Sequence, residues 1–287
     1  MNRKHAFGHK LICCITLLTI SWQISAETSF IRAQRNSDKV ITALETAVIS
    51  YKKINKAGKT IRVDLISAVH VADKEYYEQL NELFTTYDAV LYELVAPEGT
   101  DASAIDMKDT SHPVSKIQVG MKNILNLSFQ LDHIDYSKKN LVHADLSPDA
   151  IADSMSNKGE SFIGMFFKLM LQSMAMQNSK GAGSDLQYLV AMLSENRALK
   201  LKRLLAVQFE DLEEVMPDLE GEQGSTIIAE RNKKALEVLR QQLNQSKRSI
   251  AIFYGAGHMP DFDARLISEF GLKPEETHWL TAWKLSD

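Results

Sequence analysis

Ile66-Ser67-Ala68-Val69-His70 closes a run of apolar and β-branched residues with a histidine, and a helical pattern follows it. The run indicates a buried strand, and Asp73 is placed to cap the helix after it. The next apolar run, Asp88-Ala-Val-Leu-Tyr-Glu-Leu-Val95, indicates a second strand. A strand, a helix and a strand in this order form a β–α–β unit with parallel strands. The stretch therefore predicts an α/β fold.

The remaining pattern extends this unit into a mixed sheet. Residues 40–53 and 59–70 alternate apolar and polar positions around a short turn, which predicts a β-hairpin. Further strands are predicted at 140–145, 249–254 and 277–284, and a further helix at 261–270. We therefore predict an α/β (α+β) fold in a single domain, 27–287. Its central mixed sheet is built from two β–α–β halves, with a long helical insertion at about 147–245 between them.

The first 26 residues form a separate unit. A basic start is followed by the apolar segment Leu11–Ile20 and by the small residue Ala26, which is the pattern of a signal peptide. Its apolar part is short for a membrane span. Ile24, three positions before the cleavage point, is larger than usual, so an uncleaved anchor remains an alternative. The pattern predicts a periplasmic or secreted protein.

Charge and cysteine content limit the classes of partner. Both cysteines, Cys13 and Cys14, lie in the predicted signal peptide, so the mature chain has no thiol and no disulfide. Without the three basic residues of that segment, 30 Lys and Arg face 37 Asp and Glu, a net charge of −7. An acidic chain without a basic run argues against nucleic acid and against anionic membrane surfaces.

A second histidine repeats the pattern of His70 near the other end of the chain. Tyr254-Gly255-Ala256-Gly257-His258 follows the predicted strand 249–254. Both imidazoles would stand at carboxyl ends of strands, where open α/β sheets bind their ligands. Neutral imidazole is the commonest protein ligand of metals, and the glycines allow close approach to the backbone. Each histidine alone could be structural, but the pair predicts a shared site.

A buried carboxylate supplies the third candidate group. Glu93 falls inside the apolar run 88–95, where an ionised carboxylate is costly unless it is paired, protonated or bound to a cation. The β–α–β unit would place the end of its strand beside that of the His70 strand. His70, Glu93 and His258 together suit a divalent metal with open positions for water. The alternative is an ion pair of Glu93 with an arginine.

Three further residues each have two possible roles. His143 and Asp145 end the strand predicted at 140–145 and could add a ligand or orient one at a cofactor site. Asp145 is equally placed to cap the next helix. Arg231 lies on a helix with an apolar side, where arginine is either an ion-pair partner or binds a carboxylate or oxyanion.

The segment 162–176 is the most apolar helical pattern and is rich in Met and Phe. A core helix is one interpretation. Because Met adapts to irregular surfaces, a hydrophobic lid, a lipid-facing helix or the contact face of a homodimer are the others. Membrane contact through 162–176 and a homodimer therefore stay open as hypotheses.

At these residues the chain resembles the TraB/GumN/Tiki superfamily, which is related to the erythromycin-esterase-like and ChaN-like proteins. That group has two Gly-x-x-His motifs, a glutamate ending the strand after the first, and an Arg-Asn helix before the second. The matching positions here are Ser67–His70, Tyr92-Glu93-Leu94, Arg231-Asn232 and Gly255–His258. Their order agrees, and the resemblance spans about residues 60–285. Ser67 stands where the family has glycine.

The resemblance implies a function. Tiki members are associated with divalent-metal-dependent proteolysis, and other members with regulation of peptide signals. It implies an exported hydrolase of peptides, with His70, Glu93 and His258 binding Mn, Co or Zn. A water activated by the metal would be the nucleophile, and Arg231 would stabilise the oxyanion. The alternative is a non-catalytic binding protein that sequesters a peptide, haem or another small apolar ligand in the same cleft.

The predicted signal peptide can be tested by intact mass. Protein isolated from the periplasmic fraction should begin at or near Glu27, because the small residue before it completes the cleavage pattern. Full-length chain recovered from the membrane fraction would contradict cleavage and would replace the exported protein by an anchored one.

Overall fold

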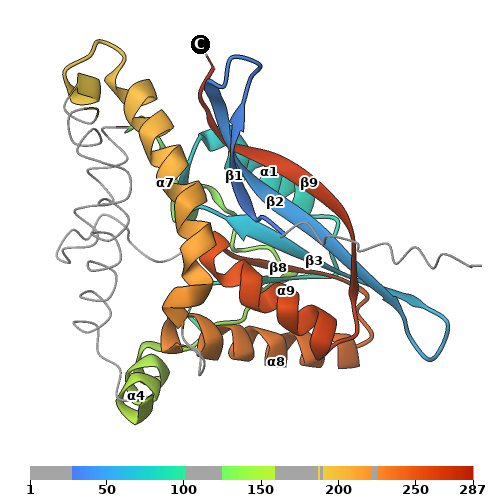
Figure 1. The fold of residues 1–287 in the computed structure, drawn as a ribbon. Coiled ribbons are helices and arrows are strands. Elements are labelled where there is room, and N and C mark those ends of the chain that lie inside the picture. The colour runs from blue at the N-terminus through green and yellow to red at the C-terminus, as the bar shows by residue number, and fades with distance from the viewer. Residues whose placement is uncertain are drawn as a thin grey trace, which may run out of the picture.

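Seven strands form one mixed sheet, which confirms the predicted α/β class (Figure 1). The structure is a computed structural model that describes residues 28–97, 99–100, 125–158, 187, 190–220 and 225–286, without the side chains of 212–220. The strands of the sheet are β1 (Ile31–Arg35), β2 (Ile41–Ile54), β3 (Thr60–Ala68), β5 (Ala89–Tyr92), β7 (Leu141–His143), β8 (Ser249–Gly255) and β9 (Lys273–Lys284). Two short strands, β4 (Val71–Ala72) and β6 (Ser128–Phe129), pair separately.

The strand order is β1-β2-β3-β8-β5-β7, and β9 pairs with β2 off this path. β2 and β3 form the predicted antiparallel hairpin. β3, β8, β5 and β7 all run parallel, so their carboxyl ends lie at one edge of the sheet. The prediction that the Glu93 strand lies beside the His70 strand is wrong, because β8 pairs with both and separates them. The helix between β3 and β5 therefore crosses over the position of β8.

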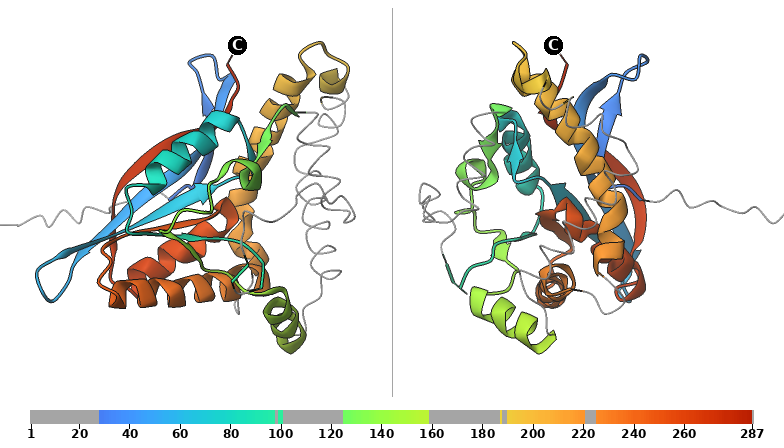
Figure 2. Two further views of the ribbon diagram at one scale, coloured as in Figure 1. Left: turned by 180° about the vertical axis from the view of Figure 1, so that it is seen from behind. Right: turned by 60° about the vertical axis from the view of Figure 1, so that its left-hand side comes forward.

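Helices cover both faces of the sheet (Figures 1 and 2). Their bounds are α1 (Lys74–Phe84), α3 (Gln130–His133), α4 (Pro148–Lys158), α7 (Arg197–Glu220), the π-helix η2 (Thr226–Glu230), α8 (Arg231–Asn244), the 3-10 helix η3 (Ala256–His258) and α9 (Met259–Ser268). α1 and α7 pack on one face, and α8 and α9 pack on the other. Consecutive residues of β8 follow this division, since Phe253 faces α1 and Ile252 faces α8 and α9.

Asp73 holds α7 against the sheet and does not cap α1. It occupies the N-cap position, as predicted, but its side chain makes no capping hydrogen bond. One carboxylate oxygen lies 2.9 Å from Lys202 Nζ on α7, and the other accepts the Lys284 backbone N–H at 2.6 Å. Glu210 adds a second attachment on α7, because its carboxylate accepts the backbone N–H of Ala33 at 3.1 Å. These contacts fix the long helix across the end of the sheet.

Several predicted segments lie outside the described residues. They are the signal peptide 1–26, the Met- and Phe-rich segment 162–176 and part of the predicted helical insertion. The described part of 147–245 carries α4, α7, η2 and α8. Within the part of the chain that the structure describes, no helix is both long and apolar enough to span a membrane.

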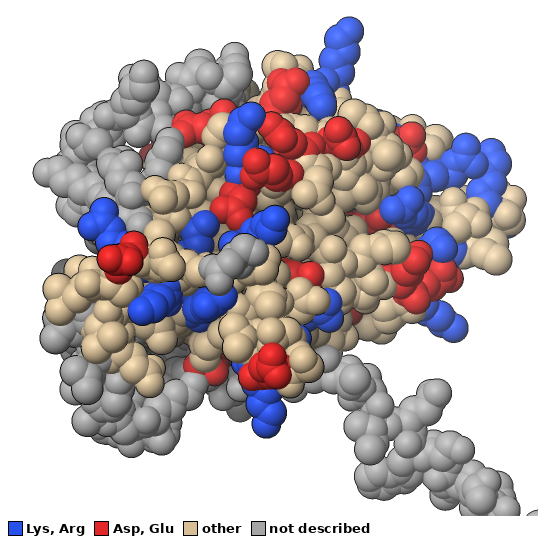
Figure 3. Space-filling view, turned by 90° about the horizontal axis from the view of Figure 1, so that it is seen from above, with Lys and Arg blue, Asp and Glu red and all other residues tan. Residues whose placement is uncertain are grey.

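Positive and negative side chains are interspersed over the face of the molecule shown in Figure 3. Some of them form exposed pairs, such as Lys52 Nζ with Glu275 Oε2 at 2.6 Å. Pairs of this kind contribute little to stability, because water screens both charges. The electrostatic interactions that shape the site are therefore the buried ones at the carboxyl edge of the sheet.

Ser67 stands where the superfamily that the chain resembles has glycine. Its side chain is fully buried in β3, and its Oγ is the one buried side-chain nitrogen or oxygen among the described residues without a hydrogen-bond partner. A desolvated hydroxyl without a partner costs about 1–3 kcal/mol. The serine is therefore a local source of instability.

Replacing Ser67 by alanine should raise the free energy of unfolding by about 1 kcal/mol, because the unpaired hydroxyl is removed and the Cβ is kept. Urea denaturation measures the change. Thr46→Val is the matched control: its buried hydroxyl is bonded to Tyr76 Oη at 3.1 Å, so this variant should lose stability. Equal losses in both variants would show that the Ser67 hydroxyl is satisfied.

Candidate functional site

A pocket of about 380 Å³ opens at the carboxyl edge of the parallel strands. It brings together His70, Glu93, Arg231 and His258, the four residues predicted for catalysis. The full lining consists of Ile31, Ala68, Val69, His70, Val71, Glu93, Phe209, Arg231, Gly255, Ala256, Gly257, His258 and Trp283. Residues from both ends of the chain therefore share one cavity.

The ends of three neighbouring strands supply the polar part of the pocket. His70 follows β3 by two residues, and His258 ends the 3-10 turn η3 directly after β8. Glu93 is the first residue after β5, which ends at Tyr92, so the prediction that Glu93 lies inside the strand is wrong. Because β8 lies between the other two strands, its Gly255 turn stands between His70 and Glu93. Arg231 begins α8 and enters from the helical layer.

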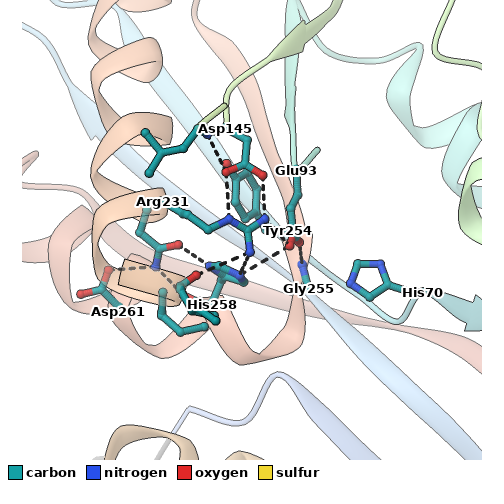
Figure 4. Close-up of polar contacts among 12 residues, drawn as sticks. His70, Glu93, Asp145, Arg231, Tyr254, Gly255, His258 and Asp261 are labelled. Carbon is teal, nitrogen blue, oxygen red and sulfur yellow. Dashed lines mark hydrogen bonds and ion pairs between the residues drawn. The ribbon is translucent and has the colours of Figure 1, made fainter. Parts of the chain in front are cut away.

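Glu93 is the centre of the polar contacts (Figure 4). Its Oε1 accepts Arg231 Nη2–H at 2.7 Å, and its Oε2 accepts the Gly255 backbone N–H at 2.7 Å. Burial alone would raise the pKa of Glu93, but the charges of His258, His70 and Arg231 and the Gly255 N–H lower it to about 2. The carboxylate is therefore ionised at neutral pH, and each oxygen keeps a second lone pair.

Arg231 is held between two carboxylates. Its Nε and Nη2 donate to the two oxygens of Asp145 at 2.9 and 2.6 Å, in addition to the bond from Nη2 to Glu93. The side chains of Arg231 and Asp145 are 10% and 0% exposed. The pKa of Arg231 is raised: burial lowers it, but the hydrogen bonds and charges of Asp145 and Glu93 outweigh that effect. The ion pair of Glu93 with an arginine, an alternative that the sequence left open, is therefore present.

Asp145 and His143, predicted as an additional ligand pair, do not line the pocket. Both oxygens of Asp145 are bonded to Arg231, and the helix cap that was its alternative role belongs to Ser147, whose Oγ accepts the Ala150 N–H at 3.2 Å. His143 Nε2 donates to the carbonyl of Leu94 at 2.6 Å. Asp145 therefore positions Arg231, and His143 ties the segment after Glu93 to β7.

The imidazole of His258 has a defined tautomer. Asn232 Nδ2 donates to the His258 carbonyl at 3.0 Å and to Asp261 Oδ2 at 2.8 Å, so Asn232 Oδ1 is the acceptor that faces His258 Nδ1 at 2.6 Å. The ring proton is therefore on Nδ1, and the lone pair of Nε2 lies 3.6 Å from Glu93 Oε1. Burial lowers the pKa of His258 to about 4, against the opposing charge of Glu93, so the ring is neutral at neutral pH.

His70 is held in the same way by another side-chain amide. Gln130 Nε2 donates to Tyr136 Oη at 2.9 Å, and Gln130 Oε1 lies 3.2 Å from His70 Nδ1. His70 Nε2 is thereby free and faces the Gly255 turn: a Cβ at Gly255 would lie 3.3 Å from Glu93 Oε2 and 3.6 Å from His70 Nε2. Glycine is therefore needed at 255 to leave this space open. Figure 4 shows Glu93 between His70 on one side and Arg231 and His258 on the other.

Two of these orienting residues were missed by sequence reasoning. Asn232 belongs to the Arg-Asn motif, and its place one residue after Arg231 was the available signal. Gln130 had none, because it reaches His70 through the pairing of β4 with β6, which also brings the Gln130 N–H within 3.0 Å of the His70 carbonyl. A two-strand contact of this size leaves no periodic pattern in the sequence.

The donor atoms of the pocket decide whether it can hold a metal ion. Among the described residues, no three His, Cys, Asp or Glu side chains are close enough, as they lie, to hold a metal ion together. Two of the proposed ligands, His258 and Glu93, are 3.6 Å apart, which suits a shared cation with bonds of about 2.0–2.2 Å. One arginine against two carboxylates leaves a net negative charge beside the imidazole nitrogens of His70 and His258. The donor types therefore suit a divalent cation in their chemistry, while His70, as it lies, does not complete a three-ligand group with the other two.

Removal of the Asp145 carboxylate should expose the dependence of the site on its ion pairs. Asp145→Ala leaves a buried guanidinium with one carboxylate partner, and breaking buried pairs costs about 3–5 kcal/mol. Urea denaturation should show a loss of that order. Glu275→Ala removes the exposed partner of Lys52 and should cost less than about 1 kcal/mol. Equal, small losses would mean that Arg231 is solvated and mobile.

Comparison of the chain with protein-family models, with curated proteins and with solved structures finds no match in any of the three. The resemblance to the TraB/GumN/Tiki superfamily therefore stays a prediction that depends on four short motifs and their order.

Proposed function

We propose that this protein is an exported hydrolase of peptides whose pocket binds a divalent cation through His70, Glu93 and His258. The observation that carries the proposal is the common orientation of the two imidazoles. Each has its Nδ1 on a side-chain amide oxygen and its Nε2 lone pair toward the carboxylate of Glu93. Metal-binding histidines have such an outer partner on the second ring nitrogen.

Glu93 is available as a ligand despite its ion pair. An ionised carboxylate accepts about four hydrogen bonds, and Glu93 makes one on each oxygen. Its pKa of about 2 makes it a weak base, so the group serves as an anionic ligand and not as a proton acceptor. The bound cation would supply Lewis-acid activation of a carbonyl and of water.

Arg231 is placed to stabilise negative charge in the substrate. Its Nε and Nη2 are committed to Asp145 and Glu93, whereas Nη1 makes two longer contacts, 3.5 Å to the Ile227 carbonyl and 3.4 Å to His258 Nε2. Nη1 is therefore the guanidinium nitrogen free to donate to a developing oxyanion. Because the carboxylates fix the group in advance, little reorganisation accompanies the reaction.

Peptides as the substrate class and export as the location both come from the sequence: the first from the family resemblance, the second from the predicted signal peptide. The pocket supports a second candidate as well, a binding protein without turnover. The observation in its favour is that much of the pocket wall is apolar, including Phe209 and Trp283. Digestion of a peptide library with and without chelator separates the two.

Metal dependence gives the direct test of the proposal. A cation present at 100 times its Kd stabilises the native state by about 2.7 kcal/mol, which at roughly 2–4 °C per kcal/mol for a chain of this size raises the Tm by roughly 5–10 °C. Chelator should lower the Tm of protein purified without it, and Mn, Co or Zn should restore it. The response should fade in acid, because protons compete for the ligands.

Single substitutions show which residues are responsible for the change of Tm with metal. His258→Ala and His70→Ala should each abolish it, and His70→Ala should leave the fold intact because its ring is exposed. His278→Ala is the control, since that exposed histidine pairs with Glu276 on β9. A full metal response in both site variants would exclude these ligands and favour the binding protein.

A further inference from the structure

We propose that the apolar end of the pocket is a specificity subsite for one uncharged, apolar side chain of the peptide, next to the bond that the polar end would cleave. This inference rests on the proposed function, because it assigns the substrate of the same pocket. It is carried by the apolar chemistry of much of the lining, by the pairing of Glu93 and Arg231 with other groups of the protein and by the fixed position of α7.

Much of the pocket lining other than the polar residues is apolar. Ile31 of β1, Val71 of β4, Phe209 of α7 and Trp283 of β9 form this apolar part, together with Ala68 and Val69 after β3. Four elements that are distant in sequence thus meet around one apolar space. An apolar side chain that enters this space loses its contact with water on several sides. The free energy of binding becomes more favourable in proportion to the apolar area that is buried.

The one polar atom of the aromatic pair is already used. Trp283 Nε1 donates to the Val71 carbonyl at 2.8 Å, so the indole presents only carbon to the pocket. Phe209 meets Trp283 edge to face, with ring centroids 5.5 Å apart and planes at 85°. Both rings are therefore oriented by contacts outside the ligand space, and neither offers a hydrogen bond to a ligand.

The charged lining residues satisfy each other. Glu93 is bonded to Arg231 and Gly255, and Arg231 is bonded to Asp145 as well. A Lys, Arg, Asp or Glu side chain in the apolar end would lose its water without gaining a partner, which is costly. The apolar end of the pocket therefore selects against charged side chains as well as for apolar ones.

The subsite is rigid and of limited size. Glu210, next to Phe209, accepts the Ala33 N–H at 3.1 Å and Arg35 Nη2–H at 2.7 Å, which fixes this turn of α7 on β1. The whole pocket, about 380 Å³, lies at the small end of the roughly 300–1,000 Å³ of ligand pockets. That space suits one side chain with its adjoining peptide group, whereas a folded partner would not fit.

The subsite can be tested by binding and by cleavage with one set of blocked peptides, acetyl-Gly-Gly-X-Gly-Gly-amide, with X as Ala, Leu, Phe, Asp or Lys. Tryptophan fluorescence reports binding because Trp283 lines the pocket. We expect Leu and Phe peptides to bind at least about tenfold more tightly than the Ala peptide, from the area they bury. Asp and Lys peptides should bind more weakly than the Ala peptide.

Two variants on one helix decide whether the pocket is responsible. Phe209→Ala should remove most of the preference for Leu and Phe. Leu205→Ala, one turn earlier on α7 and packed on the same core outside the pocket lining, should keep it. Equal preferences in the two variants, no selectivity in the wild type, or no binding of any peptide would overturn the subsite.

The same peptides separate this inference from the proposed function. Cleavage without preference for X would leave the hydrolase standing and remove the subsite. Binding that selects Leu and Phe, is lost in Phe209→Ala and is followed by no cleavage with Mn, Co or Zn present would keep the subsite and remove the hydrolase.

Discussion

The buried guanidinium of Arg231 is the group on which the site depends. It joins the start of α8 to Asp145 after β7 and to Glu93 after β5, with contacts of 2.6–2.9 Å in a nearly dry environment. Charges removed from water in this way gain stability only when their geometry is good, so the pairs specify an arrangement more than they stabilise the chain. These ion pairs fix the direction of the Glu93 carboxylate. The Gly255 turn and His258 are then positioned by their contacts with that carboxylate.

The strand order determines which residues lie next to the Arg231–Glu93 ion pair. Because β8 lies between β3 and β5, the turn that carries Gly255 and His258 stands between His70 and Glu93. A side chain at 255 would contact both, so glycine keeps the two groups open to one another. Side-chain amides then complete the arrangement: Asn232 and Gln130 each take an Nδ1–H and leave an Nε2 lone pair facing inward. The result is a polar centre in which two imidazole Nε2 atoms and an ionised carboxylate face one another, with Arg231 Nη1 3.4 Å from His258 Nε2.

Much of this could be predicted from local sequence, and the remainder could not for physical reasons. Strand periodicity identified the α/β class and the β2–β3 hairpin, while the two strand-end histidines, the carboxylate at the end of an apolar run and the arginine on a helix with an apolar side identified the four residues that meet in the pocket. Strand order depends on long-range pairing, which periodicity does not encode, so the place of β8 was missed. Asp145 was read as a ligand or a cap because its actual partner, Arg231, is far along the chain. Gln130 and Phe209 reach the pocket through short tertiary contacts that leave no pattern.

The most direct test of the account is anomalous diffraction from crystals soaked in Mn²⁺. The account predicts one peak in the pocket, at about 2.0–2.2 Å from His258 Nε2, from a Glu93 oxygen and from His70 Nε2, with Arg231 still bonded to Asp145. A pocket without a peak in Mn²⁺-soaked crystals, with Glu93 bonded only to Arg231 and Gly255, would contradict it. The role of Glu93 would then be structural, as the partner of Arg231 in a buried ion pair.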